Sequence, residues 1–253
     1  MTAYHVLGPL SVRSEGVDRT PRGPKIGKVL AMLVLRPNVA VGMDTMIEEL
    51  WEDRPPRSAV TTVRTHVYHL RRALGPALQD GALVTEPTGY RLALDAERID
   101  AAIFARAADR GRDLQAAGAT EEASAVLREA LALWRGPALA NLDPGPVLAA
   151  HVHHLEELRL AVLEMRIEAD AALGRHRQLV PEMRGLVAAH PLHEWFHARL
   201  IEALHRAGRR SEALRAYQDL RALLRRELGV EPCGDLQRLQ RDVLRGDLIR
   251  AVS

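Results

Sequence analysis

The chain has 253 residues, of which 47% are hydrophobic, enough to build one large domain or two ordinary ones. The longest apolar run, Val29 to Leu35, is too short to span a bilayer, and the N-terminus lacks the charged-then-apolar pattern of a signal peptide, so we expect a protein of the cytoplasm. A net charge of +2 does not by itself indicate a nucleic-acid binder, and the single cysteine, Cys233, excludes an internal disulfide.

Charged residues are nevertheless sorted by segment. Residues 19–36 contain five basic and no acidic residues, and residues 44–53 contain five acidic and no basic ones. Residues 54–79 contain five arginines and again no acid. A long basic surface attracts phosphates, so the local charge distribution favours DNA as a partner although the net charge does not.

Short strands and helices are predicted in the first 95 residues. Period-two patterns predict strands at Tyr4 to Leu7 and at Leu10 to Arg13. A first helix is predicted from about Lys25 to Leu35, and a second over residues 46–51 with Asp44 as its N-cap. Proline residues follow both helices and end them.

A third predicted helix, from Ser58 to Leu74, has two different faces. Apolar side chains recur at three- and four-residue steps, the spacing of a core-facing stripe, at Val60, Val63, Val67, Leu70 and Leu74. The opposite face carries Thr61, Thr62, Thr65, Tyr68, His69 and Arg72. Two β-prone runs joined by Pro87-Thr88-Gly89 follow and predict a hairpin. Helix, helix, basic helix and hairpin is the order of a winged helix-turn-helix.

From about Ile99 the pattern changes to long helices rich in alanine and leucine. Gly118, Gly174 and Gly208 each fall in a turn between two helices, and the last two are 34 residues apart, the period of tetratricopeptide repeats. Residues 135–151 interrupt the repeats and are expected to form an ordered loop or a broken helix. Three such units can bury a continuous core, so a second, all-α domain is predicted.

The sequence resembles that of the Streptomyces antibiotic regulatory protein (SARP) family of transcription activators, in its small two-domain form. The matching stretches run almost from end to end: VLGPLSV, GPK, IEELW, VRTHVYHLRRALG, TGYRL, EALALWRGPAL, LEELRLAVLEMRIEADAALGRH, HPLHEWFHARLIEALHRAGRRSEALRAYQDLR and ELGVEP. The first helix departs from the family pattern, with Ile26-Gly27-Lys28 where a larger polar residue, Arg and Ala are expected.

The resemblance implies a mainly α protein with two domains. Residues 1–95 would form an α+β winged helix-turn-helix of the response-regulator type, and residues 96–253 a tetratricopeptide-like bacterial transcriptional activation domain. It further implies an activator that binds direct repeats beside a promoter and recruits RNA polymerase holoenzyme through its sigma factor and core subunits, for a secondary-metabolite gene cluster. Two protomers are expected side by side on the DNA, in the bacterial nucleoid.

Three residues of the third helix are predicted to contact base edges in the major groove. Arg72 suits guanine, the Thr65 methyl suits thymine, and His69 suits a purine N7. Six neighbours are placed to reach phosphates or adjacent edges: Thr61, Thr62, Arg64, His66, Tyr68 and Arg71. The resemblance adds two wing residues, Arg91 as a minor-groove or phosphate contact and Tyr90 with a packing role.

Each of these contacts has an alternative without DNA. Thr61, Thr62 and His66 can be solvated surface groups. Arg64 and Arg71 can pair with the acids of the preceding helix, Glu48 or Glu49. A helical-repeat scaffold that binds only proteins is an alternative for the whole chain, although a scaffold does not need a basic helix and a wing.

An enzyme is the other alternative. His193-Glu194-x-x-His197 matches the H-E-x-x-H pattern of zinc metalloproteases, in which two histidines on one helix face hold zinc and the glutamate acts as general base. The motif falls where a repeat helix begins after Pro191, and a third ligand would have to come from His151, His153 or His154. The segment GPKIGK has the wrong glycine spacing for a phosphate loop. We therefore expect no enzymatic activity, no cofactor and no metal.

Overall fold

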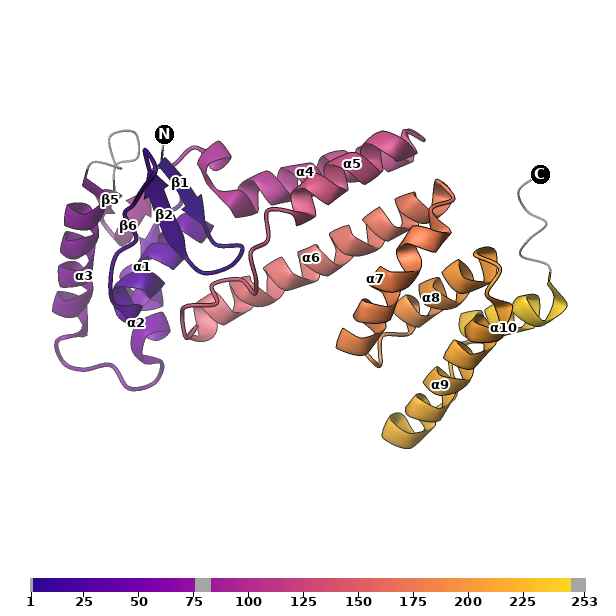
Figure 1. The fold of residues 1–253 in the computed structure, drawn as a ribbon. Coiled ribbons are helices and arrows are strands. Elements are labelled where there is room, and N and C mark those ends of the chain that lie inside the picture. The colour runs from indigo at the N-terminus through magenta and orange to yellow at the C-terminus, as the bar shows by residue number, and fades with distance from the viewer. Residues whose placement is uncertain (1, 76–82, 247–253) are drawn as a thin grey trace. The chain divides into compact units, whose positions relative to one another are not determined.

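The computed structural model describes residues 2–75 and 83–246 (Figure 1). Two compact units divide the chain, residues 1–166 and residues 167–253. We call them unit 1 and unit 2. None of the described helices is long and apolar enough to cross a membrane.

Unit 1 begins with an antiparallel three-stranded sheet in the order β1-β2-β3. The strands are β1 (Thr2–His5), β2 (Ser11–Ser14) and β3 (Val17–Asp18). Tyr4 lies opposite Val12, and both side chains are fully buried. The first two strands were predicted with limits shifted by one or two residues. The third was not, because it has only two residues and both are exposed, so it has no alternating pattern.

Three helices follow the sheet: α1 (Pro24–Leu35), α2 (Met43–Trp51) and α3 (Ala59–Leu74). All three were predicted. The expected cap of α2 was wrong, because Gly42 is the N-cap residue and Asp44 lies inside the first turn, where its negative charge still favours the positive end of the helix. Val60, which was assigned to the apolar stripe, is 40% exposed, since it lies in the first turn of α3 at the margin of the core.

The predicted hairpin is present and forms the wing. Strands β5 (Leu83–Glu86) and β6 (Gly89–Leu92) pair in antiparallel fashion, and β4 (Val41–Gly42) adds to the other edge of β6. Gly89 lies opposite Gly42, and a Cβ atom on Gly89 would come within 1.9 Å of the Val41 carbonyl oxygen. Glycine is therefore required where the two strands meet.

The remainder of unit 1 is helical. A 3₁₀ turn (Ala96–Arg98) leads into α4 (Asp100–Ala116) and α5 (Thr120–Leu131), which pack closely as a pair. Their turn contains Gly118 in the left-handed region, with φ +75°, as the glycine pattern predicted. An ordered loop then leads to α6 (Pro146–Ala172), whose last residues belong to unit 2. Of the insertion expected at residues 135–151, residues 135–145 form the ordered loop, whereas residues 146–151 are the first residues of α6.

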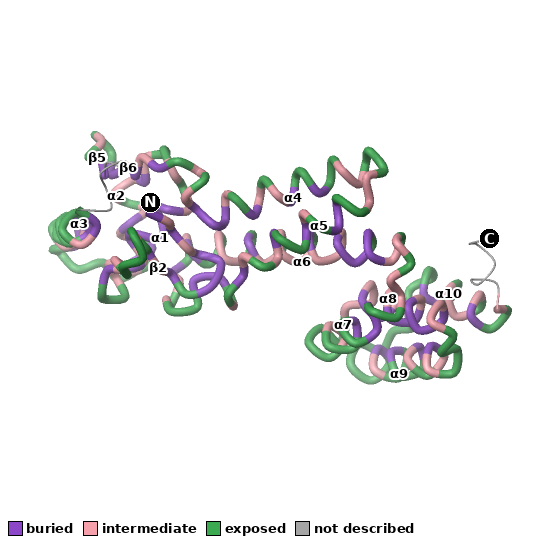
Figure 2. Tube along the Cα trace, turned by 45° about the horizontal axis from the view of Figure 1, so that its top comes forward, coloured by how far each residue is buried: buried purple, intermediate pink, exposed green. Residues whose placement is uncertain are grey.

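Unit 2 continues the repeat pattern with α7 (His176–Ala189), α8 (Glu194–Arg206) and α9 (Arg210–Leu228), followed by α10 (Gly234–Arg245). Gly174 and Gly208 make the turns before α7 and α9, with φ values of +74° and +81°. The buried residues of these helices face one another (Figure 2). Among the described residues of these helices that are fully buried, Phe196 is the largest. The period of 34 residues thus corresponds to packed helix pairs.

Two buried carboxylates connect the winged helix to the helices that follow it in unit 1. Glu49 of α2 is fully buried; its Oε1 accepts a hydrogen bond from the Gly145 N–H at 2.6 Å and its Oε2 one from the Leu148 N–H at 2.9 Å. Lys28 Nζ lies 3.8 Å from Glu49 Oε1. Because the first N–H groups of a helix lack partners within it, Glu49 caps the N-terminus of α6. A Cβ atom on Gly145 would come within 2.4 Å of the Glu49 carbonyl oxygen, so this approach needs glycine.

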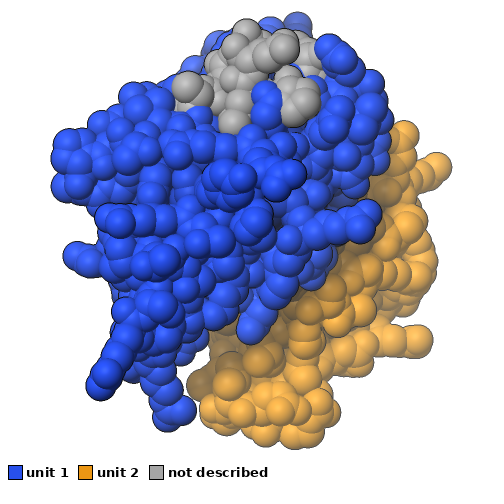
Figure 3. All heavy atoms as spheres, turned by 90° about the vertical axis from the view of Figure 1, so that its left-hand side faces the viewer, with its two compact units in different colours: residues 1–166 blue, residues 167–253 orange. Residues whose placement is uncertain are grey.

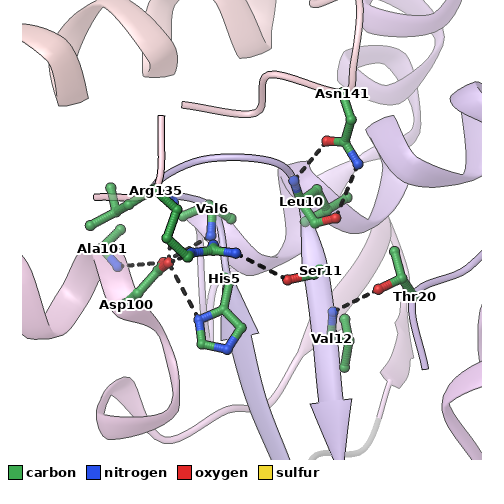
Figure 4. Close-up of polar contacts among 11 residues, drawn as sticks. His5, Val6, Leu10, Ser11, Val12, Thr20, Asp100, Ala101, Arg135 and Asn141 are labelled. Atoms are coloured by element: carbon green, nitrogen blue, oxygen red, sulfur yellow. Dashed lines mark hydrogen bonds and ion pairs between the residues drawn. The ribbon is translucent and has the colours of Figure 1, made fainter. Parts of the chain in front are cut away.

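Asp100 makes the second connection (Figure 4). Its carboxylate accepts hydrogen bonds from the Val6 N–H at 2.8 Å and the Leu7 N–H at 3.2 Å, and Arg135 Nη2 lies 3.3 Å from Oδ2. Nearby, the Asn141 side chain bonds both backbone groups of Leu10. These contacts, with Glu49, define what we call the seam of unit 1.

The seam also explains where the first helix departs from the family pattern. Gly27 is buried, and a Cβ atom there would come within 2.8 Å of Leu142 Cδ2. Lys28 is turned toward Glu49 and away from solvent, with 14% of its side chain exposed. The unusual pair Gly27-Lys28 therefore serves the contact with the loop before α6.

Candidate nucleic-acid interface

The two faces of α3 are arranged as the periodicity predicted. Val63, Val67, Leu70 and Leu74 are at most 1% exposed and pack in the core of unit 1. Figure 3 looks onto the side of unit 1 on which α3 lies. The residues of the predicted interface that are exposed on this helix are Thr61, Arg64, Thr65, Tyr68, His69, Arg71 and Arg72, whereas Thr62 and His66 are half-buried.

Two threonine hydroxyls of α3 donate to the helix itself. Thr62 Oγ1 donates to the Ser58 carbonyl and Thr65 Oγ1 to the Thr61 carbonyl, each at 3.0 Å. A hydroxyl that already donates its hydrogen to a carbonyl oxygen can still accept a hydrogen bond. Thr65 can therefore accept from a base amino group or offer its methyl group, but it is not placed to donate.

His66 is half-buried on α3 and lies within electrostatic reach of Lys25 on α1. Burial lowers the pKa of its imidazole, and the charges of Lys25 and His69 lower it further. Because the ordinary pKa of histidine is already below 7, His66 is uncharged at neutral pH. It therefore adds no positive charge to the surface of α3 under those conditions.

On the wing side of α3, the arginines are engaged within the protein. Arg71 donates to the Leu83 carbonyl at 2.8 Å and to Thr85 Oγ1 at 2.9 Å. Arg91 Nε lies 2.8 Å from Glu86 Oε1. Tyr90 is only 6% exposed, so its ring packs beneath the wing. Arg71 therefore braces α3 against strand β5.

The alternative in which Arg64 and Arg71 pair with acids of the preceding helix is wrong. Arg71 bonds strand β5, and Glu49 is turned inward to Lys28 and α6. Within residues 2–75 and 83–246, Arg64 makes no ion pair. Its guanidinium remains exposed beside the outward face of α3.

The other side of α3 borders an open groove of about 460 Å³. The described residues that line it are Pro21, Arg22, Ile26, His69, Arg72 and Ala73. Two guanidinium groups and an imidazole thus share the groove, and none of its described lining residues is a carboxylate. The basic run of residues 19–36 signalled positive charge here, but Arg22 was missed because a local pattern does not indicate which of its cations lies beside α3.

Side chains of the H-E-x-x-H motif bond to backbone groups of unit 2. His193 is the N-cap of α8, and His197 Nε2 lies 2.9 Å from the Pro191 carbonyl oxygen. Glu194 Oε2 accepts a hydrogen bond from the Cys233 N–H at 2.7 Å. Among the residues that the structure describes, no group of three His, Cys, Asp or Glu side chains is placed to hold a metal ion.

Family models match both parts of the chain. Residues 19–92 match the family described as "Transcriptional regulatory protein, C terminal", and residues 99–244 match the "Bacterial transcriptional activator domain". A winged helix with an exposed basic recognition helix, followed by this helical domain, defines a DNA-binding transcriptional activator. Such a protein is a regulator and not an enzyme, so the metalloprotease alternative is wrong.

Individual relatives identify the family. The regulatory protein DnrI of Streptomyces peucetius is 41% identical over 252 residues, which cover 96% of this chain and 92% of DnrI. The regulatory protein AfsR of Streptomyces coelicolor is 39% identical over 96% of this chain, which spans only 24% of AfsR. The chain belongs to the SARP family of transcriptional regulators, as the sequence motifs indicated.

A solved structure confirms the fold class. The structure of Mycobacterium tuberculosis EmbR in complex with a low-affinity phosphopeptide superposes with a TM-score of 0.91 at 34% identity. The match covers 96% of this chain and 65% of that chain. The mainly α architecture, with a winged helix followed by helical repeats, is therefore confirmed.

Proposed function

We propose that the protein activates transcription by binding direct repeats at a promoter and recruiting RNA polymerase holoenzyme, through contacts with the sigma factor and core subunits. The controlled genes are proposed to form a secondary-metabolite cluster, such as one for an antibiotic, in the bacterial nucleoid. Residues 1–95 would bind DNA, and residues 96–253 would carry the activating function.

The observation that carries this proposal is the outward face of α3. It presents Thr65, His69 and Arg72 to solvent, opposite the buried stripe, on a segment without acidic residues. A helix of this kind fits the major groove, where each base pair shows its own pattern of donors, acceptors and methyl groups. We assign base contacts to these three residues.

The remaining contacts are proposed to set affinity and register. They are Thr61, Thr62, Arg64, His66, Tyr68, Arg71, Tyr90 and Arg91. Arg64 and Tyr68 are the best placed of these, because both are exposed and Arg64 makes no ion pair with a described residue. Arg71, Tyr90 and Arg91 would act mainly by holding the wing in place, given their contacts within the protein.

Direct repeats are proposed because one winged helix offers few base contacts. Two protomers bound side by side, head to tail, would double those contacts and place two activator domains beside the promoter. The match to a bacterial transcriptional activator domain supports recruitment of polymerase by the helical part. We assign no single residue of the helical part to a contact with RNA polymerase.

Selection from a random-sequence DNA pool tests the proposal. The wild-type protein should enrich duplexes with two copies of one half-site in the same orientation, and a mobility shift with such a duplex should weaken steeply as salt increases. In vitro transcription from a promoter that carries the repeats should rise when the protein is added. Enrichment of no sequence, or binding that is indifferent to salt, would rule out sequence-specific DNA binding.

A further inference from the structure

The two sides of α3 differ in what their cations contact. On the wing side, Arg71 is bound to β5 and Arg91 to Glu86. On the opposite side, Arg22 and Arg72 are exposed, and neither forms an ion pair with any residue in the described ranges. The surface beside α1 therefore keeps free guanidinium groups that the wing side does not.

These free groups line the groove between the segment before α1 and the C-terminal half of α3. Arg22 lines it from the segment before α1, and His69 and Arg72 line it from α3, with Ile26 of α1 also in the lining. The neighbouring Lys25 is held elsewhere, with Nζ 4.3 Å from the centre of the Trp51 ring. The groove is thus an open channel with positive charge from both segments.

We propose that Arg22 binds a phosphodiester of the DNA strand that passes on the side of α3 away from the wing. This inference rests on the proposed insertion of α3 into the major groove. A guanidinium presents a planar fork of donors that matches two phosphate oxygens. No carboxylate is among the described residues that line the groove. Asp18, whose pKa is lowered most by hydrogen bonds from Thr20 and further by the Arg22 charge, is outside that lining and forms no ion pair with Arg22. The ligand is therefore a phosphodiester group.

The arginines on the two sides of the groove have different roles. Arg22 contributes affinity without sequence information, because a phosphate is the same at every base pair. His69 and Arg72 stand on α3 itself, where they contact bases. Loss of Arg22 should weaken binding to every duplex by the same factor, whereas loss of Arg72 should weaken binding to the target above all.

The test measures the salt dependence of binding by fluorescence anisotropy with the full chain. The probes are a duplex selected by the wild-type protein and a random-sequence duplex. Removal of one phosphate contact lowers the slope of log K against log salt concentration by about 0.9. We expect R22A to show this drop on both probes, with affinity about five-fold lower at 0.15 M salt. R22K, which keeps the charge, should retain most of the slope.

Arg110 provides the matched control, because it is an exposed arginine on α4 that makes no ion pair within the described ranges. R110A removes the same charge and should leave the slope unchanged. An R22A slope equal to that of the wild type would overturn the assignment, as would a loss confined to the selected duplex, which would mean that Arg22 contacts bases. If the wild-type protein binds neither probe, the proposed DNA binding itself fails, which is a different result.

Discussion

The seam of unit 1 and the outward face of α3 use charge in opposite ways. At the seam, Glu49 and Asp100 are buried, and each accepts at least two backbone N–H groups. On α3, Arg64 and Arg72 are exposed and form no ion pair with described residues. Buried charge is tolerated only when it is fully bonded, so the seam contributes to stability, whereas open charge remains available for a ligand. Changes at the seam should alter folding, and changes on the face should alter DNA binding.

The largest expected effect comes from removing one side of the seam altogether. A chain that ends at residue 98 lacks Asp100, Gly145 and the apolar residues of α4 and α6, which share one core with the N-terminal sheet. We expect no cooperative unfolding transition for residues 1–98 in calorimetry, because their buried carboxylate and apolar groups lose their partners. Residues 1–172, which keep the seam, should unfold cooperatively. A stable fold for residues 1–98 would mean that the seam is dispensable.

Within the seam, Glu49→Ala should have the next largest effect. It leaves two backbone N–H groups of the α6 terminus without an acceptor and leaves Lys28 without its counter-ion. We expect a loss of about 3 kcal/mol in the free energy of unfolding by urea. Glu48→Ala is the control, because this neighbouring glutamate is exposed, and its loss should cost less than about 0.5 kcal/mol. Equal stabilities of the two variants would contradict the capping role.

On the face of α3, Arg72→Ala should have the opposite effect to Glu49→Ala: it should reduce the selectivity of DNA binding and leave stability almost unchanged. A good base contact contributes about 1–3 kcal/mol of discrimination, so the ratio of target to random-sequence affinity should fall by about 5- to 150-fold. The free energy of unfolding should change by less than about 0.5 kcal/mol, because the side chain is exposed. Equilibrium binding to both duplexes, with Arg110→Ala as control, measures the ratio. A variant that keeps full selectivity would remove Arg72 from the set of base contacts.

The same contrast separates what the sequence predicted from what it did not. The buried and open faces of α3 follow from a period of 3.6 residues, which is a local property; the exposed Val60 and the half-buried Thr62, both in the first turn, departed from it. Glu49 bonds Gly145 across 96 positions, and no local pattern distinguishes it from the exposed Glu48. The roles of Arg71 and Arg22 were likewise not predicted from the local sequence. Tertiary packing binds Arg71 to β5 and brings Arg22 beside α3.

The smallest expected effect is a loss of stability in acid. His151 packs beside α1 in unit 1, and burial lowers its pKa. The charges of Arg36 and His154 lower this pKa further, whereas the charge of Glu49 raises it. The folded state therefore takes up its proton at a lower pH than the unfolded state, whose imidazole has a pKa near the ordinary value of about 6.5. This contribution to stability is complete above that pH and is lost as the pH falls through it, with a slope of at most about 1.4 kcal/mol per pH unit.

Calorimetry measures this loss of stability in the wild-type protein and in two histidine variants. The two conditions are pH 7.5 and pH 5.5, about one unit above and below the ordinary pKa of histidine. His151→Leu should reduce the dependence on pH, because leucine suits the apolar neighbours Val34, Leu35 and Leu155 and takes up no proton. His153→Leu removes an exposed imidazole from the same helix turn and should leave the dependence in place. If His151→Leu loses as much stability in acid as the wild type does, the acid sensitivity of unit 1 arises at another buried group, and His5, whose pKa burial also lowers beside Asp100, is the next to replace.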